Sequence, residues 1–154
     1  MDKINILVTD FDGVMTDGKR YVNETGIYSK CYNMKDGLAI KNFQKLGIKI
    51  MILSGDNSDI TQKIGNRLNV DYIKIGIKNK YEELTNFLKN NSLSSENIIY
   101  IGDDLNDKEC LDYAKYKFTP KDGNKALLRI ENIIQLESKG GEGCLSELYN
   151  FFNP

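Results

Sequence analysis

Short apolar runs rich in isoleucine and valine alternate with amphipathic stretches, and this alternation limits the possible folds more than any other feature of the sequence. The expected strands are residues 4–9, 48–53, 72–75, 98–101, 117–119 and 133–136. The expected helices are residues 37–46, 58–68, 80–90, 105–115, 123–130 and 144–152. Alternation of this kind is typical of right-handed βαβ units around a parallel sheet. The sequence therefore predicts a doubly wound, Rossmann-like α/β fold, with a mostly parallel sheet and helices on both faces.

One segment, residues 19–33, does not follow the alternation. Two short β-prone runs flank the turn-forming sequence Asn-Glu-Thr-Gly at 23–26, a combination typical of a β-hairpin. We expect this hairpin to project from the sheet just after the first strand. The sequence contains no repeat, low-complexity tract or linker, and only two prolines. A single domain over residues 1–154 is therefore expected.

Charge, cysteine and histidine counts exclude several classes of function. The 21 basic and 22 acidic residues nearly cancel, so no overall basic field attracts nucleic acid or a membrane surface. No signal pattern or membrane-length apolar run is visible, and a cytoplasmic protein is expected. Cys31, Cys110 and Cys144 are widely spaced and expected to be buried thiols. Because histidine is absent, Ser-His-Asp catalysis and histidine-bound zinc are excluded, and acid–base chemistry falls to carboxylates, lysine or tyrosine.

Polar residues follow three of the expected strands at the point where each strand ends. The first strand is followed by Asp-Phe-Asp-Gly at 10–13, the second by Ser-Gly-Asp at 54–56, and the strand at 98–101 by Gly-Asp-Asp at 102–104. Lys80 opens the helix that precedes this last strand. In open α/β sheets, ligands bind beyond the carboxyl ends of the strands. We therefore expect these residues to meet at one edge of the sheet.

The carboxylates in this set are suited to phosphoryl transfer. Asp10 and Asp103, with a backbone carbonyl nearby, are hard oxygen ligands of the kind that Mg²⁺ prefers. Asp10 is then a candidate nucleophile towards phosphorus, because metal and lysine together neutralise the charges that would repel it. Asp12, two residues further on, is a candidate to protonate the leaving alcohol and later to activate water on the aspartyl-phosphate.

Hydrogen-bond donors for the phosphate come from the first two of these connections and from the start of the helix at 80–90. Ser54, Lys80 and the backbone amides of Gly13 and Gly55 are the candidates. Gly13 also lets the loop approach the phosphate closely, because it has no side chain.

Four short motifs, in this order and at this spacing, resemble those of the haloacid dehalogenase superfamily. They are Asp10-x-Asp12-Gly13-Val14, Ser54-Gly55, Lys80 and Gly102-Asp103-Asp104-x-x-Asp107. The segments DFDGVMTDG, NMKDG, NKYEEL, YIGDDLND and GGEG are similar to those of its small, cap-less branch, which dephosphorylates 3-deoxy-2-ulosonate sugar phosphates. The resemblance covers nearly the whole chain.

The resemblance implies an Mg²⁺-dependent phosphatase that has no cap domain and acts through an aspartyl-phosphate. It implies that Asp10 is the nucleophile and a metal ligand, and that Asp103 is the second metal carboxylate. Asp12 would be the acid/base and would bind the metal through its backbone carbonyl. Asp104 and Asp107 would support these groups from behind. Members of this branch are similar in forming homotetramers, in which the hairpin at 19–33 builds the interface and a neighbouring subunit closes each active site.

The resemblance also bears on the substrate. The octulosonate 8-phosphate phosphatases usually carry an arginine directly after the glycine of the second motif and a GGRG segment near the C-terminus, where this chain has Asp56 and Glu142. An anion in place of a cation weakens the grip on a sugar carboxylate. The two substitutions resemble those of the nononate 9-phosphate phosphatases. The resemblance therefore implies a nononate (KDN or N-acylneuraminate) 9-phosphate as the preferred substrate, with 3-deoxy-D-manno-octulosonate 8-phosphate as the alternative. By this resemblance Asp56 binds sugar hydroxyls, Glu142 reaches the site from the C-terminal tail, and Arg67 grips the carboxylate across a subunit boundary.

Two other classes of function are weighed against this one. A phosphoacceptor signalling domain also combines an α/β sheet with an acidic cluster and a lysine, but the positions of Ser54 and Lys80 do not match it. A non-catalytic relative would serve as the oligomerisation module of a sugar-activating enzyme, but every expected catalytic side chain is present here. Asp36, finally, is expected to cap the helix that begins at residue 37.

Overall fold

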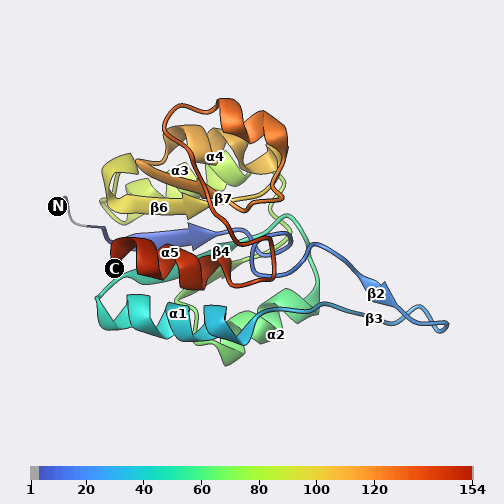
Figure 1. The fold of residues 1–154 in the computed structure, drawn as a ribbon. Coiled ribbons are helices and arrows are strands. Elements are labelled where there is room, and N and C mark those ends of the chain that lie inside the picture. Colours follow the sequence, from blue (N-terminus) through green and yellow to red (C-terminus); the bar gives the residue numbers. More distant parts are fainter. Residues whose placement is uncertain (1–3, 154) are drawn as a thin grey trace.

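A six-stranded parallel sheet forms the centre of the protein, as predicted. The structure is a computed structural model that describes residues 4–153 (Figure 1). The strands are β1 (Ile6–Thr9), β4 (Lys49–Leu53), β5 (Tyr72–Lys74), β6 (Ile98–Ile101), β7 (Tyr116–Thr119) and β8 (Ile134–Gln135). Their order is β5-β4-β1-β6-β7-β8, and every neighbouring pair is parallel.

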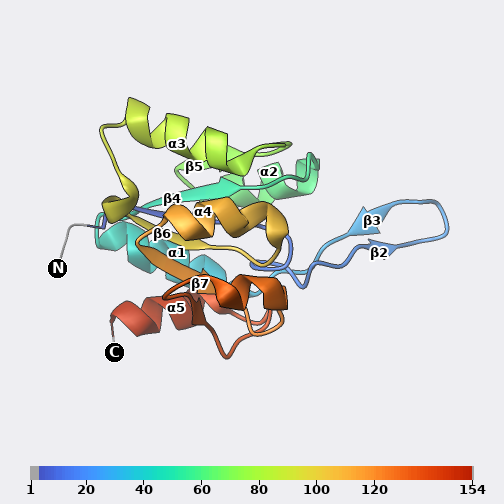
Figure 2. The same ribbon diagram turned by 90° about the horizontal axis from the view of Figure 1, so that it is seen from above.

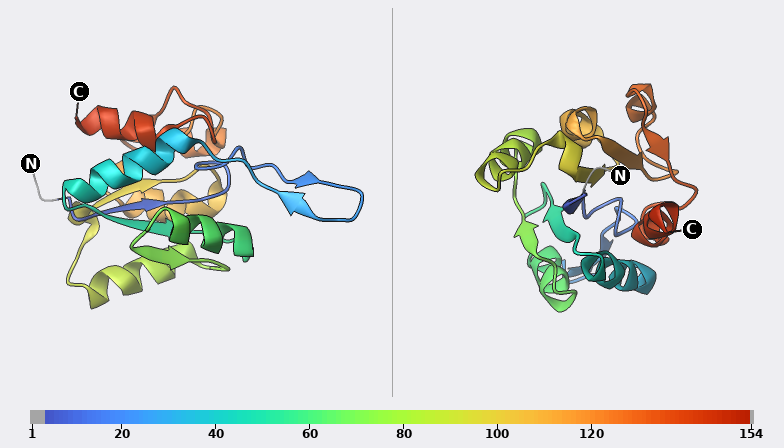
Figure 3. Two further views of the ribbon diagram at one scale, coloured as in Figure 1. Left: turned by 90° about the horizontal axis from the view of Figure 1, so that it is seen from below. Right: turned by 90° about the vertical axis from the view of Figure 1, so that its left-hand side faces the viewer.

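Helices cover both faces of this sheet, so that the central strands β1, β4 and β6 each contribute to two hydrophobic clusters. One face carries α1 (Met34–Lys45), α2 (Asp59–Arg67) and α5 (Cys144–Phe152), and the other carries α3 (Lys80–Asn90) and α4 (Lys108–Tyr113) (Figure 3). Successive side chains of a strand point to opposite faces. In β1, Leu7 therefore joins the cluster under α1 and α5, while Ile6 and Val8 join the cluster under α3 and α4. The near-continuous apolar strands of the sequence are explained by this burial on both sides.

The predicted hairpin is present and extends well beyond the sheet (Figures 1 and 2). It consists of β2 (Tyr21–Val22) and β3 (Tyr28–Ser29), which pair antiparallel. At its tip the Asn23 side chain accepts hydrogen bonds from the backbone amides of Thr25 and Ile27. At its base a β-bridge between Thr16 and Tyr32 returns the chain to the carboxyl edge of the sheet.

Two predicted helices are shorter and tighter than expected. The segment 105–115 divides into a 3-10 helix (Leu105–Asp107) and α4, because Asp104 and Asp107 form a capping box around the first turn. The segment 123–130 forms only a 3-10 helix (Lys125–Arg129), and a further short 3-10 helix (Ser95–Asn97) precedes β6. None of the helices in residues 4–153 is long and apolar enough to cross a membrane.

Two smaller expectations were wrong. Asp36 does not cap its own helix: α1 begins at Met34, and Asn33 accepts the hydrogen bond from the amide of Lys35. Asp36 is instead buried and accepts a hydrogen bond from the amide of Ser146 in α5, at 3.1 Å. Among the cysteines, Cys110 and Cys144 are buried as expected, but Cys31 lies exposed on the hairpin.

Candidate active site

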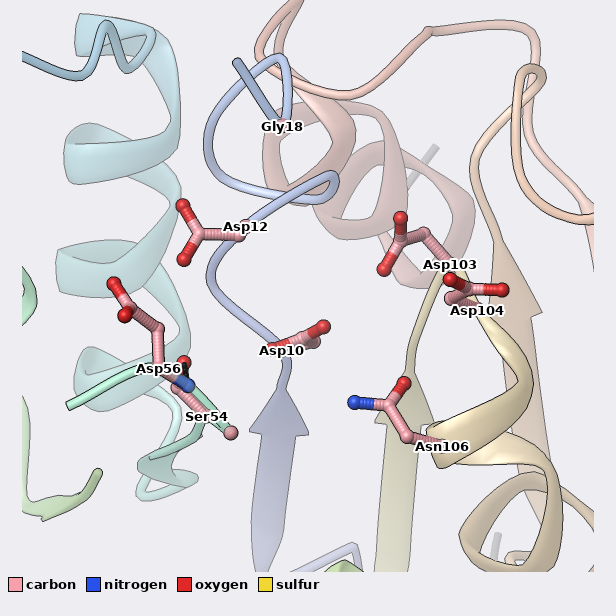
Figure 4. A pocket seen from close by; sticks show the side chains of 9 residues that line it. Asp10, Asp12, Gly18, Ser54, Asp56, Asp103, Asp104 and Asn106 are labelled. Atoms are coloured by element: carbon pink, nitrogen blue, oxygen red, sulfur yellow. Dashed lines mark hydrogen bonds between the residues drawn. The ribbon is translucent and has the colours of Figure 1, made fainter. Parts of the chain in front are cut away.

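A cavity of about 320 Å³ opens at the carboxyl ends of the central strands, where the sequence predicts the site. Its lining residues are Asp10, Asp12, Gly18, Ser54, Gly55, Asp56, Asp103, Asp104 and Asn106. Figure 4 shows the carboxylate of Asp10 in the middle, those of Asp12 and Asp56 on one side, and those of Asp103 and Asp104 on the other. The parallel sheet brings these residues together, because β1, β4 and β6 are neighbours and end at the same edge.

Asp10 stands at the centre of a buried acidic group. Carboxylate oxygens of Asp10, Asp103 and Asp107 all lie within 4.8 Å of one another. The ammonium group of Lys80 is 3.0 Å from Asp10 Oδ1 and 2.8 Å from Asp107 Oδ1. Asp10 Oδ1 also accepts a hydrogen bond from the backbone amide of Phe11, at 2.7 Å. One lysine, with a side chain only 1% exposed, thus faces the carboxylates of Asp10 and Asp107 behind the cavity.

This crowding changes the protonation equilibria of the group. Burial, and then the charge of Asp107, raise the pKa of Asp10 well above its usual value, although Lys80 opposes the change. Burial and the charge of Asp107 likewise raise the pKa of Asp103 to about 6. Burial lowers the pKa of Lys80, but the carboxylates of Asp10 and Asp107 outweigh it, and the net pKa is raised. Lys80 therefore stays charged.

Asp107 has a supporting position behind the cavity, as the sequence predicts. Its Oδ1 accepts hydrogen bonds from Lys80 and from the Tyr100 hydroxyl at 2.7 Å. Its Oδ2 accepts from the backbone amides of Asp103 and Asp104, at 3.2 and 3.4 Å. Both oxygens are engaged with protein donors, so Asp107 orients its neighbours and leaves Asp10 and Asp103 as the carboxylates better suited to a metal ion.

Asp12 lies across the cavity mouth from Asp103 and is held on both carboxylate oxygens. The Thr16 hydroxyl donates to its Oδ1 at 3.2 Å, and the ammonium group of Lys30 lies 2.6 Å from its Oδ2. Lys30 also lies 2.5 Å from Asp56 Oδ2, and Arg20 donates to Asp56 Oδ1 at 3.0 Å. The hairpin thus supplies two cations to one side of the cavity.

The predicted phosphate donors have different surroundings. Ser54 is buried at the cavity wall, where its Oγ accepts a hydrogen bond from the Asp56 amide at 3.2 Å, and Gly55 lines the cavity beside it. Lys80 lies behind Asp10, with a side chain only 1% exposed. The amide of Gly13 donates weakly to Thr16 Oγ1, at 3.4 Å.

Gly13 has a second reason to be glycine. Its φ is +89°, and an added Cβ would lie 2.0 Å from Asp103 Oδ2. Both the backbone conformation and the closeness of Asp103 therefore exclude a side chain here.

Two predicted substrate contacts lie outside the cavity lining of this chain. Arg67 is exposed at the C-terminal end of α2, which begins near the cavity and leads away from it. Glu142 is exposed on the segment after β8, which packs against the loop of Asp12: the Gly141 amide donates to the carbonyl of Val14 at 3.0 Å. Their roles towards the substrate stay predictions.

Several contributors to the site are absent from the sequence prediction. Thr16 and Lys30 hold Asp12, Tyr100 holds Asp107, and Asn106 lines the cavity. Asn106 lies inside the fourth motif, between Asp103 and Asp107, so its position in the sequence was a usable signal. The sequence contains no such signal for Lys30, because its contacts with Asp12 and Asp56 depend on the direction in which the hairpin returns to the sheet.

The carboxylates fit a divalent cation. Asp10 and Asp103 present hard oxygen atoms at a buried position where their mutual repulsion, together with Asp107, is only partly offset by Lys80. Mg²⁺ binds such sites through one or two carboxylates while keeping water or phosphate oxygens as its other ligands. Asp10 and Asp103 would hold the ion, together with a backbone carbonyl of the same loop.

Comparisons with known proteins agree with this geometry. Residues 73–143 match the family model of haloacid dehalogenase-like hydrolases. The 3-deoxy-D-manno-octulosonate 8-phosphate phosphatase of Haemophilus influenzae is 28% identical over 150 residues, covering 96% of this chain and 82% of that protein. This match favours an enzyme over a signalling domain or a non-catalytic module.

Solved structures match over nearly the whole fold. A probable phosphatase from Pseudomonas syringae superposes with a TM-score of 0.91 at 28% identity, covering 97% of this chain and 84% of that chain. The cobalt-bound form of the Haemophilus influenzae phosphatase superposes with a TM-score of 0.89 at 27% identity, covering 97% and 87%. Residues 4–153 form no cap domain over the cavity. The chain is a phosphoric monoester hydrolase that is similar to the haloacid dehalogenase-like hydrolases in sequence and fold.

Proposed function

We propose that the protein is an Mg²⁺-dependent phosphatase of a 3-deoxy-2-ulosonate sugar phosphate, with 3-deoxy-D-manno-octulosonate 8-phosphate as the favoured substrate. The convergence of Asp10, Asp12 and Asp103 on one cavity, backed by Lys80, carries this proposal. The name of the Haemophilus influenzae relative supports the substrate, and the cobalt ion in its structure supports a divalent metal.

In the proposed reaction Asp10 attacks phosphorus, and the bond from phosphorus to the sugar oxygen breaks. Asp12 gives its proton to the departing oxygen. Water then attacks the aspartyl-phosphate, Asp12 takes a proton from it, and inorganic phosphate leaves Asp10. A bound Mg²⁺ ion would neutralise charge on the phosphoryl group and on Asp10. Lys80 supports the same charge from behind, while Ser54 and the amide of Gly55 are donors for the phosphate oxygens.

The nine-carbon preference expected from Asp56 and Glu142 finds no support in the relatives described above. The charges around Asp56 supply a physical reason. Both of its oxygens are paired, one with Lys30 and one with Arg20, so the anion is neutralised within the chain. The side chain of Arg20 is 55% exposed beside the cavity and restores a cation close to the motif-two position. A sugar carboxylate is therefore not repelled there, and Asp56 does not disfavour an eight-carbon substrate.

The test is phosphate release from 3-deoxy-D-manno-octulosonate 8-phosphate and from a nononate 9-phosphate, measured side by side with Mg²⁺ and with EDTA. We expect faster release from the eight-carbon sugar and loss of release with EDTA. Asp10→Asn should abolish turnover of both, because an amide is a poor nucleophile. Near-normal rates in Asp10→Asn would overturn the covalent mechanism, whereas a preference for the nine-carbon sugar would overturn only the substrate assignment.

A further inference from the structure

Lys30 is the most enclosed cation that the hairpin contributes to the site. It follows β3, where the hairpin returns to the sheet, and its side chain is only 1% exposed. Its ammonium group lies 5.5 Å from the ring centre of Phe11, whose backbone sits between Asp10 and Asp12. A charge enclosed in this way requires close partners. Lys30 has two, Asp12 at 2.6 Å and Asp56 at 2.5 Å.

The two partners of Lys30 come from different connections of the sheet. Asp12 belongs to the loop after β1, and Asp56 to the loop after β4. The loop of Asp56 is held by contacts outside the hairpin, because the Gly76 amide donates to the Asp56 carbonyl at 3.0 Å and the Asp56 amide donates to Ser54 Oγ at 3.2 Å. Asp56 therefore provides an anchored end for the bridge. The bridge therefore sets the position of Asp12 relative to a second, independently held loop.

Asp12 needs such support, because it is less enclosed than Asp10. Its side chain is 29% exposed at the cavity mouth, whereas that of Asp10 is 7% exposed. Apart from Lys30, the side-chain contact that orients its carboxylate is the 3.2 Å hydrogen bond from Thr16 to Oδ1. Without the contact to Oδ2, the carboxylate is free to turn about its bond to Cβ.

We propose that Lys30 is a positioning residue, which holds the Asp12 carboxylate at the cavity mouth in the orientation needed for proton transfer. The inference rests on the proposed function, in which Asp12 gives one proton to the sugar oxygen and takes one from water. Lys30 itself exchanges no proton in this scheme. A misplaced proton-transfer group reduces the rate even when the substrate still binds.

The test is a double-mutant cycle between Lys30→Met and Asp12→Asn, with turnover measured on the sugar phosphate that the wild-type protein hydrolyses. Methionine keeps much of the length and volume of lysine but removes the charge. We expect Lys30→Met to lower kcat roughly 10- to 100-fold, a part of the usual contribution of acid–base catalysis, with KM changed less than about threefold. In the Asp12→Asn background the same substitution should lower kcat less than about threefold.

The outcomes separate this inference from the proposed function. An equal fall in kcat in both backgrounds, or a change confined to KM, would overturn the positioning role of Lys30. Absence of metal-dependent turnover in the wild-type protein would instead overturn the proposed function. Lys19→Met, at an exposed position on the same hairpin, is the matched control and should retain wild-type kcat. If Lys30→Met does not fold, as judged by thermal unfolding, Lys30→Gln replaces it in the same cycle.

Discussion

At the scale of single residues, the site depends on close packing against glycines as well as on charge. Gly13 touches Asp103, a Cβ on Gly102 would lie 2.4 Å from Asp107 Cγ, and a Cβ on Gly140 would lie 2.2 Å from the carbonyl oxygen of Gly13. The carboxylates of Asp103 and Asp107 are thus packed against Gly13 and Gly102, and Gly140 is packed against the backbone of Gly13. Substitution of these glycines should damage the site before it damages the fold.

The Gly13→Ala variant tests whether such a glycine is needed for activity, and Gly47→Ala is its matched control. Gly47 has a similar φ of +80°, but no atom lies within 4 Å of the position where its Cβ would be. Both alanine variants should lose about 1–2 kcal/mol of unfolding free energy, because an L-residue is strained at positive φ. Only Gly13→Ala should also lose activity, by roughly 100-fold or more, because its Cβ displaces Asp103.

Urea unfolding and steady-state kinetics on both variants decide the matter. Equal activity in the two would show that Asp103 moves aside at no cost.

Sequence reasoning reached those residues whose roles follow from local motifs. Asp10, Asp12, Ser54 and Asp103 all line the cavity, because a parallel sheet must bring the ends of β1, β4 and β6 together. Lys30 was missed because it is 18 residues from Asp12 in the chain, and no spacing rule connects them. Its contact depends on the length and direction of the hairpin, which the sequence pattern does not determine.

At the scale of elements, the junction between α1 and α5 depends on a buried carboxylate. α5 begins after Gly143, which has no side chain to cap the free amides of the first turn. Asp36, from α1, accepts the hydrogen bond from Ser146 instead. Its Oδ2 has no hydrogen-bond partner among the described residues, and burial raises the pKa of Asp36 to about 6. This cap therefore stabilises α5 at a cost in desolvation.

The raised pKa of Asp36 predicts that the stability of the fold depends on pH. Because the unfolded chain carries an ordinary Asp36 with a pKa near 3.8, the folded state binds a proton more tightly than the unfolded state. Stability should therefore fall as the pH rises from about 4 to about 6, by up to about 3 kcal/mol from this group.

Asp36→Asn removes the titration and hence this contribution. The difference in unfolding free energy between wild type and variant should favour wild type more at pH 4.5 than at pH 8, as measured by urea denaturation. Any pH-independent effect of the asparagine amide on stability cancels in this comparison. A difference that stays constant with pH would show that the pKa of Asp36 is not raised in the folded protein.

The elements that the sequence predicted best are a strand buried on both sides and a helix with one clear apolar face. The bounds of β6 and α3 agree with the predicted ranges. The run Ile-Ile-Tyr-Ile at 98–101 is stable only as a buried strand, and the apolar face of α3 is stable only when it packs against the sheet. The 3-10 helix before α4 escaped prediction because the side chain of Asp107 turns inward to Lys80 and tightens the first turn. Such tertiary contacts override the helical periodicity of the segment.

At the scale of the whole molecule, the hairpin projects from the sheet and carries exposed apolar side chains (Figure 1). Tyr21, Val22 and Ile27 expose large apolar side chains on it, Ile27 to 69%. Exposed apolar surface of this kind marks contact sites between proteins. We propose that the hairpin joins four copies of the chain, as the resemblance in sequence implies.

Ile27→Glu tests the proposed assembly, because a buried unpaired charge opposes association. The wild-type protein should elute with the mass of four 17.5-kDa chains in size-exclusion chromatography with light scattering, and the variant with a lower mass. Leu46→Glu, which places the same charge at an exposed apolar position outside the hairpin, should leave the mass unchanged. A monomeric wild-type protein would refute the proposal.

The one-way direction of the sheet has a practical consequence. All six strands of the main sheet run in one direction, so β1 starts on the side away from the cavity and the hairpin. Figure 1 shows that α5 ends on this same side. Fusion partners, dyes or surface linkers joined near either end of the chain would stand on the opposite side from the incoming substrate. A sample tethered to a sensor chip by such a linker should present its cavity outward, with its hairpin free to meet other copies.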